Sequence, residues 1–354
     1  MGKRECENNP NTPKIMTIQS NKTWLYEISF IRPILLFLLV AYHAFAPYCG
    51  AWDGDIVDNN EIYKWLAYAF RAFRLEAFVF VSGYVFAQQI LKQHKFTSLK
   101  SLISSKFKRL IIPCWIFGVG YALIFSKLEL EVVVSGIGHL WYLPCLFWCF
   151  IFAYLIYRSK MKPIYCVIGL MILSTLSFAP IPLQLNRAMY YLLFFYLGGL
   201  FWEHSTAIHS NTTIKRTILS WCLFLALFIG VNLLREYNMD MYAEVNLIGK
   251  SIILSTNNIA KMFLAFAGIV SLYMTAVQFL NKHTLCDGIV NVGNYGYGVY
   301  IFHQFILIGL YYHTSLPMVV GSDWLPWIGT VIALSGSLLL SWLFRKTKLG
   351  RQLI

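Results

Sequence analysis

An apolar run at residues 31–45 constrains the fold more than any other feature of the sequence. It reads Ile-Arg-Pro-Ile-Leu-Leu-Phe-Leu-Leu-Val-Ala-Tyr-His-Ala-Phe and, with its flanks, is long and hydrophobic enough to cross a bilayer. Similar runs follow along the 354 residues, of which 58% are hydrophobic and only 13% charged. A soluble domain usually carries about twice that share of charge. The sequence therefore predicts an all-α fold, a polytopic helical membrane bundle of about ten transmembrane helices.

The charged residues between the runs alternate in sign. Residues 53–61 carry Asp53, Asp55, Asp58 and Glu61, whereas six lysines and arginines fall within residues 92–109. Basic loops stay on the cytoplasmic side of a membrane, so we expect both termini to be cytoplasmic and the loop at 53–61 to be external. We expect a cytoplasmic polar tail at 1–23 and a membrane domain at 24–350. The expected spans are 28–48, 66–90, 108–126, 139–157, 163–180, 188–203, 216–234, 257–280, 295–313 and 325–344.

The net charge and the cysteines exclude other classes of partner. The formal net charge is +13, but its distribution over alternate loops sets topology and argues against a nucleic-acid partner. The eight cysteines fall mainly inside apolar runs, with no CxxC pair and no Cys/His pair at zinc spacing. We interpret them as buried small residues, and we expect neither a disulfide framework nor a metal site.

Two ionisable residues lie on the first run. Arg32 and His43 are eleven positions apart, close to three helical turns, so both project from one face about 16 Å apart along the axis. Ionisable groups in a membrane helix usually face a bundle interior or a wet cavity. This layout suits a site that holds an anionic donor at one end and performs proton chemistry at the other. The alternative is an arginine that snorkels to the headgroups and a histidine that only packs.

The second span carries three more ionisable residues in its outer part. Arg71 and Arg74 share a helix face at spacing i, i+3, and Glu76 is expected to point elsewhere. Interfacial snorkelling is the alternative for the two arginines. Further along this span, Ser82 and Tyr84 are expected to line a pore or bridge helices, and Gly83 to permit close helix approach.

Six segments, taken together, resemble the acyltransferase family 3 membrane proteins, bacterial multi-pass O-acyltransferases. Arg32 and His43 fit the R-x10-H motif of that family. The other five segments are similar to family motifs and occur in the same order: Glu76–Tyr84 (EAFVFVSGY), Lys108–Pro113 (KRLIIP), His139–Pro144 (HLWYLP), Phe194–Gly199 (FFYLGG) and Tyr295–Gln304 (YGYGVYIFHQ). The sequence departs from the family at Ser29, where an acidic residue is common, and at Pro33, where a small residue is common.

The resemblance implies a function and a set of site residues. The implied reaction moves an acyl group, expected to be acetyl, from cytoplasmic acyl-CoA to a sugar hydroxyl of an extracytoplasmic or lipid-linked glycan. No bound cofactor is implied; acyl-CoA is a co-substrate, and the lipid bilayer is that of the bacterial inner membrane. His43 is then the catalytic base or the residue that is transiently acylated. Residues assigned to donor binding are Arg32, Lys106, Lys108 and Arg109, and those assigned to the pore or acceptor side are Arg71, Arg74, Glu76, Ser82, Tyr84, His139, Trp141 and His303.

Three alternatives stay open. The segment Arg-Leu-Glu-Ala-Phe at 74–78 is similar to sequences of the branch that includes glucan succinyltransferases. Transfer of succinyl or another acyl group to a glucan is therefore an alternative. A glycan or lipid transporter would also suit many spans with buried charges, although no internal repeat is visible. A membrane scaffold without activity is the third reading. His139 and His303 can each orient a partner, bind the acceptor or simply pack.

Overall fold

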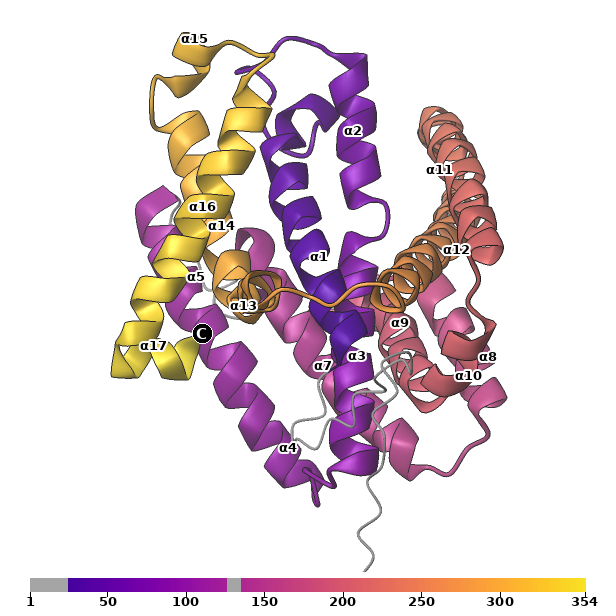
Figure 1. Ribbon diagram of the computed structural model, residues 1–354. Coiled ribbons are helices and arrows are strands. Elements are labelled where there is room, and N and C mark those ends of the chain that lie inside the picture. Colours follow the sequence, from indigo (N-terminus) through magenta and orange to yellow (C-terminus); the bar gives the residue numbers. More distant parts are fainter. Residues whose placement is uncertain (1–24, 126–134) are drawn as a thin grey trace, which may run out of the picture.

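The structure is a computed structural model that describes residues 25–125 and 135–354, and all regular structure in these residues is helical (Figure 1). The tail expected at 1–23 lies outside the described residues. The first half of the chain contains α1 Tyr26–Ala44, η1 Ala46–Cys49, α2 Glu61–Arg71, α3 Arg74–Ala87, η2 Gln88–Lys92, α4 Leu99–Lys106, η3 Phe107–Ile111, α5 Ile112–Phe125, η4 Gly138–Trp141, α7 Tyr142–Arg158 and α8 Pro163–Thr175. The second half contains α9 Leu185–Glu203, α10 Ser205–Asn211, α11 Ile214–Tyr242, α12 Leu247–Leu280, α13 Asp287–Asn294, α14 Gly296–Tyr312, α15 Leu316–Val320, α16 Leu325–Lys346 and α17 Lys348–Leu353.

Helix α1 lies at the centre of the bundle. It packs against α2, α3, α12, α13, α14 and α16, so it contacts both halves of the chain (Figure 1). Its leucines at 35, 36 and 39 are almost completely buried. Pro33 falls in the second turn of α1, and the helix continues through it. The buried face of α1 is therefore held inside the protein, whereas Tyr26 and Phe37 are exposed.

Helices α3 and α9 approach each other closely through glycine. A Cβ atom built at Gly83 would collide with the backbone carbonyl of Phe195, and one built at Gly198 would collide with the carbonyl of Phe80. Each helix therefore presents a glycine to the backbone of the other, the arrangement by which small residues allow membrane helices to pack. The expectation that Gly83 permits close helix approach is confirmed.

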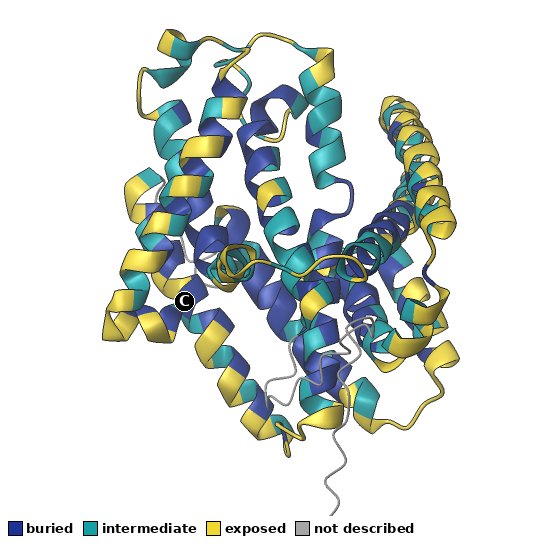
Figure 2. Ribbon diagram, in the orientation of Figure 1, coloured by how far each residue is buried: buried dark blue, intermediate teal, exposed yellow. Residues whose placement is uncertain are grey.

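Every expected span coincides with helix in the structure. Within the described residues, six helices are long and apolar enough to cross a membrane: Tyr26–Ala44, Leu99–Phe125, Gly138–Arg158, Ile214–Tyr242, Leu247–Leu280 and Leu325–Lys346. The number of ten crossings and the cytoplasmic position of the termini stay predictions. The large side chains on the outer face of α11 are exposed and apolar, as contact with lipid requires (Figure 2).

The span expected at 66–90 differs from the structure in its continuity. The helix is broken at Ala72 and Phe73 into α2 and α3. Neither residue is a proline or a glycine, so the local sequence carries no signal for the break. Phe73 is buried against Phe224, with ring centroids 5.4 Å apart, and against Gly268, so tertiary packing accounts for it.

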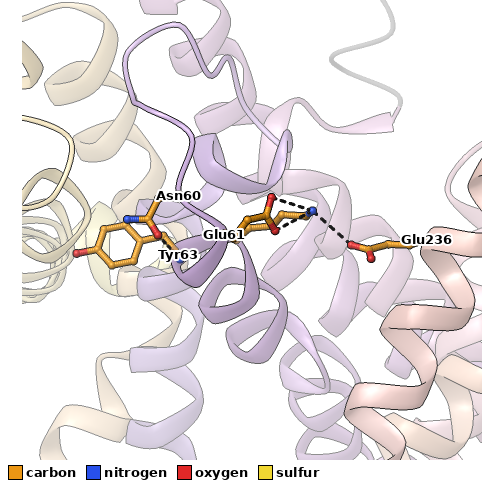
Figure 3. Close-up of polar contacts among 5 residues, drawn as sticks. Asn60, Glu61, Tyr63 and Glu236 are labelled. Atoms are coloured by element: carbon orange, nitrogen blue, oxygen red, sulfur yellow. Dashed lines mark hydrogen bonds and ion pairs between the residues drawn. The ribbon is translucent and has the colours of Figure 1, made fainter.

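The expected spans 216–234 and 257–280 leave a loop of about twenty residues between them, and the structure corrects this expectation. Helix α11 continues to Tyr242 and α12 begins at Leu247. The ammonium of Lys64 in α2 lies 3.4 Å from Glu236 and 3.2 Å from Glu61, and the two carboxylates flank it in Figure 3. Asn60 caps the start of α2 by accepting a hydrogen bond from the Tyr63 backbone N–H. These contacts fix the far end of α11 beside α2.

Candidate active site

Three histidines from three parts of the chain meet in the core. His43 lies near the end of α1, His303 in α14 and His139 in η4. All three are buried, and the His303 ring centroid lies 4.9 Å from that of His43 and 5.0 Å from that of His139. Within the described residues, no three His, Cys, Asp or Glu side chains are placed to hold a metal ion. A neutral imidazole carries a hydrogen on one ring nitrogen and a lone pair on the other, so a cluster of three suits proton chemistry.

Carbonyl partners fix the tautomers of His43 and His303. Nδ1 of His303 lies 3.0 Å from the carbonyl oxygen of Val299, and Nδ1 of His43 lies 2.9 Å from that of Leu39. A carbonyl only accepts, so each Nδ1 carries the hydrogen in the neutral ring and each Nε2 holds a lone pair. The His43 Nδ1–H is shared with Nε2 of His303, 3.2 Å away. Nε2 of His43 forms no hydrogen bond within the described residues, which leaves it available as a base.

His139 serves to attach η4 to α14. Its backbone N–H donates to Oε1 of Gln304 at 2.8 Å, and its carbonyl accepts from the Tyr300 hydroxyl at 2.6 Å. Its ring Nε2–H donates to the carbonyl of Ile301 at 3.1 Å. The remaining ring nitrogen, Nδ1, is buried and has no hydrogen-bond partner in the described chain. This arrangement holds the third imidazole against His303.

A cavity of about 530 Å³ has a cluster of cations in its lining, and none of the three histidines belongs to that lining. Three of the four residues predicted to bind the donor line it: Arg32, Lys106 and Arg109. The fourth, Lys108, is exposed and lies outside the lining, because the helix turns it away from the bundle. The Lys106 ammonium lies 3.6 Å from the centroid of the Phe150 ring. The cavity therefore has a strongly cationic end, as binding of a polyanion requires.

The lining of this cavity includes residues that hydrogen-bond to the histidines. Leu39 and Tyr300 line the cavity, and these are the residues whose carbonyl and hydroxyl groups bond His43 and His139. Ser82 also lines it and donates to the carbonyl of Phe78 at 2.9 Å. Ser82 thus has no base beside it and is a lining residue.

A second cavity, of about 380 Å³, is lined by Arg71, Arg74 and Glu76. Glu76 was expected to point away from the two arginines, but all three residues line this cavity. The break at residues 72 and 73 changes how Arg71 lies relative to Arg74 and Glu76, which both belong to α3. Glu76 is almost completely buried and lies 3.0 Å from the ammonium of Lys261. Leu75 lines both cavities, so the two are neighbours.

Four residues predicted for the pore or acceptor side line neither cavity: Tyr84, His139, Trp141 and His303. Tyr84 bridges helices instead, because its hydroxyl lies 3.3 Å from that of Tyr273 in the interior. The Arg187 guanidinium lies over the Trp141 ring, 4.1 Å from its centroid, and Trp141 also packs beside Tyr191. His139 and His303 act through the contacts described above.

Sequence reasoning missed three cationic residues of the two cavities. Arg345 lines the first cavity and donates to the carbonyl of Asn294 at 2.7 Å. Arg235 and Lys261 line the second. Each lies on a helix with no recognised motif around it, and the basic end of the last span was assigned only to topology. The one signal in the sequence was that Arg235 and Lys261 interrupt or border apolar runs.

Comparison with known proteins places the chain in a family. No curated protein and no solved structure matches it. A family model described as an acyltransferase domain matches residues 25–346, nearly the whole chain. That range contains both cavities and all three histidines. The protein, a multi-pass membrane acyltransferase, therefore belongs to acyltransferase family 3.

Proposed function

We propose that this protein moves an acetyl group from cytoplasmic acyl-CoA to a sugar hydroxyl on an extracytoplasmic or lipid-linked glycan at the bacterial inner membrane. The observation that supports it best is the first cavity, which joins a cationic cluster to residues that bond the buried histidines. Family membership supports acyl transfer as the chemistry.

The cationic end of the first cavity suits the phosphates of CoA. Arg32, Arg109 and Arg345 offer planar donor groups that match phosphate oxygens, and Lys106 adds a point charge. Apolar side chains line the cavity as far as Leu39, whose carbonyl bonds His43, and His43 stands about 16 Å from Arg32 along α1. An extended pantetheine arm has a comparable reach, so the thioester would arrive at the histidines while the phosphates stay at the arginines.

His43 would act as the general base in this reaction. Its Nε2 takes the proton of the sugar hydroxyl while the oxygen attacks the thioester carbonyl. The C–S bond then breaks, and the CoA thiolate takes the proton from the imidazolium to leave as a thiol. His303 Nε2 accepts from Nδ1–H of His43 and stabilises the positive charge that develops on the ring. In the other order of events, Nε2 is itself acylated and then passes the group to the sugar.

The test compares two histidine variants in a host whose surface glycans are analysed by mass spectrometry. His43→Ala removes the base, whose contribution is typically about 10²–10⁴-fold, so glycan acylation should fall below detection. His283→Ala, at an exposed histidine, is the matched control and should leave acylation unchanged.

A His43→Ala protein that acylates glycans at the wild-type level would reject the proposal. Rapid quenching of the wild-type enzyme with labelled acetyl-CoA then separates the two mechanisms, because only the acylated-histidine route leaves label on His43. Parallel reactions with succinyl-CoA decide between acetyl and the larger donor.

A further inference from the structure

Three arginines from three helices face the second cavity without a counter-charge. Arg71 ends α2, Arg74 begins α3 and Arg235 belongs to α11. Within the described residues, none of the three forms an ion pair or a side-chain hydrogen bond. Arg74 is only 5% exposed, and its Nε and Nη1 atoms are buried without a hydrogen-bond partner.

The acidic residue in this cavity does not balance them. Glu76 pairs with Lys261 at 3.0 Å, so this one carboxylate and this one ammonium offset each other. The guanidiniums rest on aromatic rings instead: Arg71 lies 4.2 Å from the Tyr68 centroid and Arg74 lies 3.8 Å from the Tyr42 centroid. Of the three arginines Arg74 is buried, Arg71 is half-buried and Arg235 is exposed. A buried charge such as that of Arg74 is costly unless it is paired and hydrogen-bonded. The cavity is thus arranged for a ligand that brings negative charge.

The rest of the lining suits a sugar. Tyr191 adds an aromatic ring to those that carry the arginines, and Asn232 offers an amide. The Asn232 Nδ2 donates to the carbonyl of Phe228 at 2.8 Å, which leaves Oδ1 to accept from a hydroxyl. A cavity with aromatic walls and a few fixed polar groups is typical of small-molecule sites.

This cavity lies next to the catalytic histidine. The Tyr42 ring that carries Arg74 is 5.1 Å from the His43 ring, and Leu75 lines both this cavity and the first one. We propose that the cavity binds the acceptor and selects one with an anionic oxygen, from a sugar carboxylate or from the phosphate of a lipid-linked sugar, beside the hydroxyl that is acylated. This inference rests on the proposed function and names the class of its acceptor.

The experiment measures binding to the full chain in nanodiscs with two matched pairs of probes. Glucuronic acid is compared with glucose, and undecaprenyl phosphate with undecaprenol. At least one anionic probe should bind about tenfold or more tightly than its neutral partner, and added salt should weaken that binding. The pair that responds identifies the source of the negative charge.

Two variants connect the binding to the arginines. Arg74→Gln and Arg71→Gln should each weaken binding of the anionic probe about tenfold to hundredfold, because a charged hydrogen bond is lost. Arg187→Gln, at an exposed arginine outside both cavities, should bind as wild type. Acetyl-CoA binding should be unchanged in all three. Arg71 is less buried than Arg74. If Arg74→Gln fails to fold, the affinity of Arg71→Gln for the anionic probe therefore tests the inference.

Three results would overturn the inference: equal affinity for anionic and neutral probes, no binding of either anionic probe, or wild-type affinity in the arginine variants that fold. Failure of the wild-type protein to bind acetyl-CoA would instead reject the proposed function. The two failures are therefore distinguishable.

Discussion

At the scale of single residues, the contact between His43 and His303 matters most for the chemistry. His303 holds its own Nδ1–H on a backbone carbonyl, so its Nε2 can only accept from His43 in the neutral state. In this position it orients the ring of His43 and supports its protonated form, the part that a carboxylate plays in other catalytic groups. We regard His303 as a positioning residue.

The prediction for His303 separates this role from simple packing. His303→Leu should lower kcat about tenfold to hundredfold and leave the KM for acyl-CoA nearly unchanged, since a hydrogen bond to a charged ring is lost. His303→Gln retains an acceptor oxygen and should restore part of kcat. Steady-state kinetics of both variants provides the check, and equal kcat values for the two would reduce His303 to a packing residue.

Arg32 and Lys108 are a natural pair for testing donor binding. Both were predicted from the sequence to bind the donor, but only Arg32 lines the cavity. Arg32→Ala should weaken acyl-CoA binding about tenfold or more, and Arg32→Lys should recover only part, because a point charge replaces a planar fork.

Lys108→Ala is the control and should bind acyl-CoA nearly as wild type. Isothermal titration with purified protein measures all three affinities. An unchanged affinity in Arg32→Ala would remove Arg32 from the donor site.

Sequence motifs identified site residues that share a helix face or a short segment. They did not identify residues that tertiary packing brings to the site from distant helices. Arg32 and His43 are visible because their spacing on one helix is readable from the sequence. Arg235 and Arg345 reach the cavities from helices far along the chain, so only the tertiary packing brings them there. For the same reason the contact of His139 with His303 could not be foreseen, although each was a candidate.

At the scale of helices, hydrophobic length predicted where helix occurs but not where it breaks. All ten expected ranges fall on helix because apolar runs of this length have no other stable form in lipid. The break between α2 and α3 arises from packing of Phe73, and no proline or glycine at residues 72 and 73 indicates it in the sequence. That break sets how Arg71, in α2, lies relative to Arg74 and Glu76, which both belong to α3.

The contact of α3 with α9 gives a prediction about stability. Gly83→Val would drive a side chain into the backbone of Phe195, which cannot move as a flexible side chain would. Overpacking of a core typically costs about 1–3 kcal/mol, and we expect a loss at the upper end of that range or beyond.

Gly120→Val is the matched control, because a Cβ at Gly120 in α5 meets open space. Thermal unfolding in detergent should show a clear loss of stability for Gly83→Val and little change for Gly120→Val. Similar melting temperatures for the two variants would contradict the close packing of α3 and α9.

At the scale of the whole molecule, the proposed sides of the membrane follow from loop charge. In Figure 1, α4, which lies within the basic segment 92–109, is at the lower end together with α17, and the start of α2, beside the acidic loop, is at the upper end. We predict that a cysteine at position 55, in a cysteine-free background, reacts with an impermeant reagent added outside intact cells. A cysteine at position 100 should stay unlabelled until the cells are opened. The reverse pattern would exchange the donor and acceptor sides.

Leu75, the one side chain that lines both cavities, has an electrical consequence. In the proposed arrangement, water enters from each side of the membrane and stops at this leucine. A membrane at 100 mV dissipates about 2.3 kcal/mol for every elementary charge that leaks across it. A narrow apolar constriction excludes hydrated ions, whereas an uncharged thioester can approach it. In this arrangement the protein transfers an acyl group from one side of the membrane to the other without conducting ions.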